Sequence, residues 1–99
     1  MDLSGTYAAK GTNPGGKDGY EAKLIIARTG DVYRVEWYFD GQLGAAGVGL
    51  GREGFLSVGY QMGNGCGVVV YEVGADGALR GQWAIPGTLA VGTEVATKE

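Results

Sequence analysis

The chain has 99 residues, which is the size of one domain with a modest hydrophobic core. Its formal net charge of −3 lacks the basic footprint of nucleic-acid-binding proteins, so we expect no nucleic-acid partner. The sequence has no histidine and only one cysteine, Cys66, which excludes a Cys–His pair and an intrachain disulfide.

Glycine is the most unusual feature of the composition, with 21 residues against only two prolines. The glycines separate short alternating segments that are rich in valine, tyrosine, tryptophan and leucine. Many short strands joined by glycine-rich turns are typical of a β-sandwich or β-barrel. We therefore predict a single all-β domain over residues 1–99.

Eight strands are predicted in chain order, and none of the chain has sustained helical periodicity. They cover residues 3–10, 20–28, 32–39, 43–50, 55–62, 66–73, 78–85 and 89–96. Alternation is clearest in 32–39, VYRVEWYF, and the turns TGD at 29–31 and GADG at 74–77 are good hairpin sequences. The longest connection is KGTNPGGKDG at 10–19.

The two halves of the chain, about 3–50 and 55–96, look like a degenerate repeat. At an offset of 46 residues, Arg34 matches Arg80 and Trp37 matches Trp83. Eight sequential strands with short links favour an antiparallel up-and-down barrel, since closure removes both exposed sheet edges. A barrel-like sandwich is the alternative.

Period-2 alternation also predicts which side chains face the interior. For the strand at 66–73 we choose the phase that places Val69, Tyr71 and Val73 inside, because the other phase would bury Glu72 without a partner. The predicted interior consists of Val69 and the following residues: Leu3, Tyr7, Leu24, Ile26, Tyr33, Val35, Trp37, Phe39, Val48, Leu50, Leu56, Val58, Tyr60, Tyr71, Val73, Leu79, Trp83 and Ile85.

The predicted interior contains many aromatic side chains, among them Trp37, Tyr60 and Trp83. One interpretation is a ligand pocket with aromatic walls and a few hydroxyl groups. The alternative is that the rings simply fill the barrel, because eight strands leave just enough room for side chains.

The loop at 10–19 and its counterpart at 61–67 are candidate recognition loops, because loops on a rigid scaffold often carry binding residues. They contribute the candidates Asn13, Lys17, Asp18, Tyr20 and Asn64. The alternative is that both are ordinary linkers.

No catalytic, cofactor-binding or metal-binding residues are predicted. Serines lack a base to activate them, and no calcium-loop signature is present. A glycosidase pair or a calcium site would need carboxylates, and the candidates are Asp18, Asp31, Asp40, Asp76, Glu36 and Glu94. Most of them fall in predicted turns or on outward faces, where a solvated charge is the expected state. We therefore expect no enzyme and no cofactor.

With the chosen phase, Val68 and Val70 face outward on one strand and form an apolar stripe. Exposed stripes of this kind often mark an interface. A symmetric homodimer is the simplest closed assembly, because one self-complementary patch suffices. The alternative is the reversed strand phase, in which these valines belong to the core.

The run of motifs G-T-Y, G-T-N-P-G-G, T-G-D-V-Y-R-V-E-W, G-V-V-V-Y-E-V and D-G-A-L-R-G-Q-W resembles a group of small glycine-rich bacterial proteins. They are often labelled fibronectin-binding or hypothetical, and the resemblance covers nearly the whole chain. It implies a periplasmic or extracellular location, although no signal peptide is visible here. No apolar run is long enough for a membrane helix, so we expect no membrane insertion.

Taken together, the sequence predicts a non-enzymatic binding or adhesion-type barrel that recognises a macromolecular partner. A small-molecule carrier with an aromatic-lined interior is the main alternative, and a self-associating structural module is another.

Overall fold

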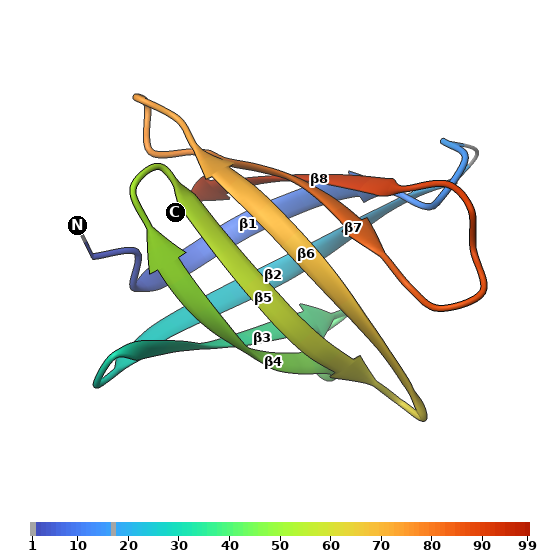
Figure 1. Ribbon diagram of the computed structural model, residues 1–99, viewed down its shortest axis with the longest axis horizontal. Helices are drawn as coiled ribbons and strands as arrows, with labels where there is room; N and C mark the ends of the chain where they lie inside the picture. Colours follow the sequence, from blue (N-terminus) through green and yellow to red (C-terminus); the bar gives the residue numbers. More distant parts are fainter. Residues whose placement is uncertain (1, 17) are drawn as a thin grey trace.

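A computed structural model describes residues 2–16 and 18–99 of the chain. Its eight antiparallel strands close into a barrel in which each strand pairs with its sequence neighbours and the last pairs with the first (Figure 1). The strands are β1 (Gly5–Thr12), β2 (Gly19–Thr29), β3 (Val32–Phe39), β4 (Gln42–Arg52), β5 (Phe55–Met62), β6 (Gly65–Val73), β7 (Leu79–Ala84) and β8 (Gly92–Lys98). The predicted all-β barrel is therefore confirmed, and the sandwich alternative is wrong.

The up-and-down order gives the barrel two different ends. The β1–β2, β3–β4, β5–β6 and β7–β8 connections lie at one end, on the right in Figure 1, and β1 begins at the other. The β3–β4 connection is a tight hairpin in which Asp40 and Gly41 have φ angles of 51° and 80°. Positive φ at both central residues is the requirement of a type I′ turn, which matches the twist of the flanking strands.

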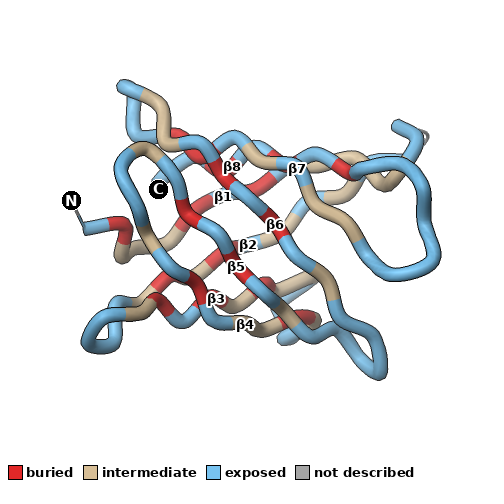
Figure 2. The backbone as a smooth tube through the Cα atoms, viewed as in Figure 1, coloured by how far each residue is buried: buried red, intermediate tan, exposed pale blue. Residues whose placement is uncertain are grey.

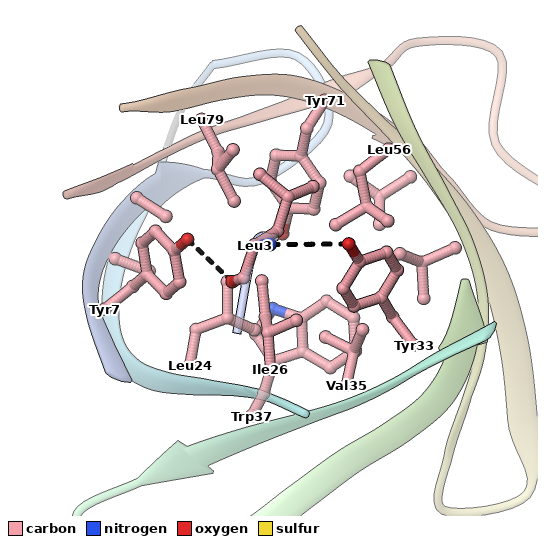
Figure 3. Close-up of a cluster of buried hydrophobic side chains, with 14 of the residues drawn as sticks. Leu3, Tyr7, Leu24, Ile26, Tyr33, Val35, Trp37, Leu56, Tyr71 and Leu79 are labelled. Carbon is pink, nitrogen blue, oxygen red and sulfur yellow. Dashed lines mark hydrogen bonds between the residues drawn. The ribbon is translucent and has the colours of Figure 1, made fainter. Parts of the chain in front are cut away.

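The end at which β1 begins is filled and closed by the core. Leu3 precedes β1 and is inserted into the barrel, where its backbone is held between two tyrosines (Figure 3). The Tyr7 hydroxyl donates to the Leu3 carbonyl at 2.8 Å, and the Leu3 amide donates to the Tyr33 hydroxyl at 3.4 Å. Around Leu3 pack fully buried aliphatic side chains such as Leu24 and Leu56. Leu3 therefore acts as a plug for this end.

The last strand begins later than predicted. Residues 85–91 form a loop at the open end, in which the Thr88 hydroxyl donates to the Ile85 carbonyl at 2.9 Å. Leu89 is fully exposed there instead of starting a strand. Strand β8 therefore covers Gly92–Lys98, three residues after the predicted start.

Val48 and Leu50 were expected inside, and this prediction is wrong: both are about half exposed on the outer face of β4. The pairing of β3 with β4 shifts by one residue after Trp37, where Gly44 is the extra residue on β4. Beyond that bulge the inward positions of β4 are Ala45 and then glycines. The glycines leave room for large side chains from β3 and β5.

The chosen phase of β6 is confirmed. Val69 and Tyr71 are buried, whereas Val68 and Val70 are 57% and 46% exposed. The same alternation of buried and exposed positions is visible along β5 and β6 in Figure 2.

Candidate functional site: an aromatic cup with a buried glutamate

The half of the barrel opposite the Leu3 plug is hollow. It holds a cavity of about 420 Å³ that reaches the loops at the open end, and we call this cavity the cup. Most side chains in its wall are aromatic or aliphatic, and Asn13 and Glu94 are the polar exceptions apart from tyrosine hydroxyls. The lining residues are Asn13, Pro14, Tyr20, Trp37, Phe39, Ala45, Tyr60, Met62, Val69, Tyr71, Trp83, Ile85 and Glu94.

Most of the site residues expected from the sequence lie in the cup. Tyr20, Trp37, Tyr60 and Trp83 all line it, together with Asn13 from the β1–β2 loop. Trp37 is almost fully buried, whereas Trp83 is only half-buried.

The remaining candidates from the loops have other positions. Asp18 and Asn64 are exposed in connections at the open end and do not line the cup. Lys17 lies outside the described residues.

The aromatic walls depend on glycines of neighbouring strands. Strand pairing places Tyr60 opposite Gly67 and Trp83 opposite Gly92, and each ring lies over the backbone of its glycine. A Cβ atom added at either glycine would overlap the ring. Some of the glycines that made the composition unusual therefore leave room for the aromatic rings of the cup.

Glu94 was expected to be a solvated surface charge, and this prediction is wrong, because its side chain is only 3% exposed. It points inward from β8, directly between Gly11 of β1 and Gly81 of β7. One strand further from β8 on each side, Tyr20 of β2 pairs with Gly11 and Tyr71 of β6 pairs with Gly81. Because both intervening residues are glycines, each tyrosine ring can lean across its neighbour strand toward Glu94.

Three donors converge on the Glu94 carboxylate. The Tyr20 hydroxyl donates to Oε1 at 2.7 Å, the Trp37 indole Nε1 donates to Oε2 at 3.3 Å, and the Tyr71 hydroxyl also donates to Oε2. A buried carboxylate is costly unless hydrogen bonds replace its water. Glu94 therefore links β8 to β2, β3 and β6 across the barrel interior.

These contacts keep the surrounding tyrosines protonated. Burial, reinforced by the negative charge of Glu94 and the hydrogen bonds to it, raises the pKa of Tyr71 well above 10 and raises the pKa of Tyr20 as well. Burial next to the same charge also raises the pKa of Tyr60. The cup therefore contains one carboxylate surrounded by neutral hydroxyl groups.

Folding stability should fall at alkaline pH for this reason. The folded protein holds the Tyr20 and Tyr71 protons above pH 10, whereas the unfolded chain, with ordinary tyrosine pKa values, releases them. The unfolded state then binds fewer protons, so the free energy of unfolding is fully maintained below pH 10 and decreases above it. Urea unfolding at pH 8, 10 and 11 should show this decrease, and Tyr71→Phe should make it less steep. Equal stability at pH 8 and 11 would contradict the assignment.

The described residues contain neither a metal-binding cluster nor a helix that could span a membrane.

No protein-family model and no curated protein sequence matches the chain. The resemblance to small bacterial glycine-rich proteins stays a prediction, and so does the internal repeat.

Proposed function

We propose that this protein is a non-enzymatic binding protein that holds a small molecule in the cup. The observation that carries the proposal is a cavity that is open at one end, has aromatic walls and contains a single buried carboxylate. Its volume of about 420 Å³ falls within the usual range for small-molecule sites. Aromatic walls and a few fixed polar groups are the usual composition of such sites, because the walls supply affinity and the polar groups fix orientation.

The composition of the wall also favours binding over catalysis. Among the lining residues that the structure describes, Glu94 is the single carboxylate, and none is a serine, threonine, cysteine or lysine. Acid–base catalysis usually needs two groups in different protonation states, and covalent catalysis needs a nucleophile. The hydroxyls of Tyr20 and Tyr71 donate to Glu94, and burial raises the pKa of Tyr20, Tyr60 and Tyr71, so all three hydroxyls stay neutral.

Filling the cup should weaken binding of a neutral apolar probe, and Ala45→Leu is the variant that does this. Ala45 is buried on β4 and lines the cavity, so a leucine there takes up space that a ligand needs. We expect the affinity for N-phenyl-1-naphthylamine to fall about tenfold or more, because overpacking of a site costs about 1–3 kcal/mol. Probe emission and quenching of tryptophan fluorescence both report the binding.

Ala46→Leu is the matched control. Ala46 is the next residue on β4, is opposite Glu36 and points to the outer face of the barrel. This variant adds the same atoms to the same strand without entering the cup, so it should bind the probe like the wild type. Equal binding by both variants would place the probe elsewhere on the molecule and contradict the proposal.

We also propose that the chain self-associates through its outer face, and a specific observation favours this. Val68 and Val70 on β6 are exposed, and across β5 lie Val48 and Leu50 on β4, which are exposed as well. Strand pairing places only Gly59 and Ser57 of β5 between these two ridges. The outer patch formed by these six residues has no charge, so its best partner is another uncharged apolar surface, and a second copy of the chain supplies one.

Val70→Lys should therefore abolish self-association without unfolding the protein. Its side chain is exposed, so a lysine there costs little stability but places a charge within the outer patch. Light scattering should show an associated wild type and a monomeric, folded variant. Thr97→Lys, exposed on β8 and paired with β1 away from the patch, is the charge-matched control. A wild type that is monomeric at high concentration would rule out the interface.

A further inference from the structure

The proposed ligand site contains a buried negative charge, Glu94, that none of the described residues neutralises with an ion pair. Among the described residues the ion pairs are Lys23 with Glu99 and Arg80 with Asp76, and neither involves Glu94. All three hydrogen-bond partners of Glu94 are neutral donors. The cup therefore has a negative potential at Glu94, and a low-dielectric wall strengthens its effect.

The hydrogen-bonding capacity of Glu94 is also incompletely used. An ionised carboxylate can accept about four hydrogen bonds, and this one accepts three from the part of the chain that the structure describes. Oε2 receives both Trp37 and Tyr71, whereas Oε1 receives only Tyr20. Oε1 therefore keeps an acceptor position, and Glu94 belongs to the lining of the cup.

The aromatic walls near this charge suit a cation as well. Tyr20 lies at the centre of an edge-to-face group, with its ring 6.1 Å from both the Phe39 and the Trp83 ring. On another part of the wall, the Trp37 and Tyr60 rings are 5.3 Å apart. The faces of tyrosine and tryptophan rings attract cations, and more strongly where water is excluded.

We propose that the ligand is an amine with an apolar body, whose protonated nitrogen donates a hydrogen bond to Glu94 Oε1 inside the cup. The aromatic rings cover the apolar part and stabilise the positive charge. A ligand with a carboxylate would place two like charges together in a low-dielectric site and would be rejected. This inference rests on the proposed function and adds the chemical class of the ligand.

The test compares three compounds that share one alkyl chain: n-octylamine, 1-octanol and octanoate, each displacing N-phenyl-1-naphthylamine from the wild-type protein at pH 7. We expect octylamine to bind about 10-fold to 100-fold more tightly than octanol, because its ammonium group forms an ion pair with Glu94 that the neutral hydroxyl of octanol cannot form. Octanoate should bind most weakly. In Glu94→Gln, which keeps the shape of the side chain, the advantage of octylamine over octanol should disappear.

The outcomes separate this inference from the proposed function. If octanol displaces the probe as well as octylamine does, the cup binds small molecules but the amine assignment is wrong. Failure of octylamine to displace a bound probe also overturns the assignment. If the probe itself does not bind, the proposed function fails and the inference fails with it. The wild-type comparison stands even if Glu94→Gln does not fold.

Discussion

Gly81→Ala should lower the free energy of unfolding by about 3 kcal/mol, because it removes the space that Tyr71 needs to reach Glu94. An added Cβ atom at Gly81 would lie 2.7 Å from Tyr71 Cδ1 and 2.9 Å from the Val70 carbonyl oxygen. Tyr71 is fully buried, so its ring cannot move aside without disturbing the core. The tyrosine hydroxyl would then lose its bond to a buried carboxylate. Urea unfolding measures the loss.

Gly59→Ala is the control for this variant, since it is also a glycine-to-alanine change within a strand. Gly59 lies on the outer face of β5, and an added Cβ atom there meets nothing within 4 Å. Its φ angle is not in the left-handed region, so alanine should be neutral or slightly stabilising through the unfolded state. If both variants lost the same stability, the cost would come from the strand backbone and the role assigned to Gly81 would be wrong.

Leu3→Ala should destabilise the protein by about 3 kcal/mol, because it leaves a void in the plug at the closed end. Leu3 is 6% exposed and belongs to the main core cluster. Its backbone is fixed by Tyr7 and Tyr33, so the segment cannot easily move inward to fill the space. The remaining contacts of β1 with β2 and β8 should preserve the barrel itself.

Leu89→Ala serves as the control for the plug. Leu89 is fully exposed in the β7–β8 loop, so its truncation should change the free energy of unfolding by no more than about 0.5 kcal/mol. A similarly small effect of Leu3→Ala would mean that the N-terminal segment does not close the barrel in solution.

Much of the barrel could be predicted because its strands alternate clearly between apolar and polar residues. In β3, Tyr33, Val35 and Trp37 share the inner face as the alternation indicated. For β6 the penalty of burying Glu72 selected the correct phase. Strand β4 was misjudged because Val48 and Leu50 are more apolar than the glycines between them, although the glycines face inward.

The central residue of the site was missed for a related reason. In β8, Glu94 alternates with Val95, and a carboxylate next to a valine normally indicates that the valine is inside. The opposite arrangement is stable here only because Gly11 and Gly81 flank Glu94 across the sheet and admit Tyr20 and Tyr71. This cross-strand row of residues can be recognised only when the strand register is known. The sequence offered one signal for the inward face of β8, namely the small residues Gly92 and Ala96, which lie two positions before and two positions after Glu94.

The occupancy of the cup can be tested most directly through the two indole N–H groups. The chain has two tryptophans, Trp37 and Trp83, and both line the cup. Both indole N–H groups donate hydrogen bonds to β8: Trp37 donates to the Glu94 carboxylate, and Trp83 donates to the Thr93 carbonyl. In a ¹⁵N–¹H correlation spectrum, titration with N-phenyl-1-naphthylamine should shift both indole signals and leave the backbone amide of Ser57, in the outer patch, unchanged. Unmoved indole signals at saturating probe, with changes confined to the outer face, would contradict a ligand site inside the barrel.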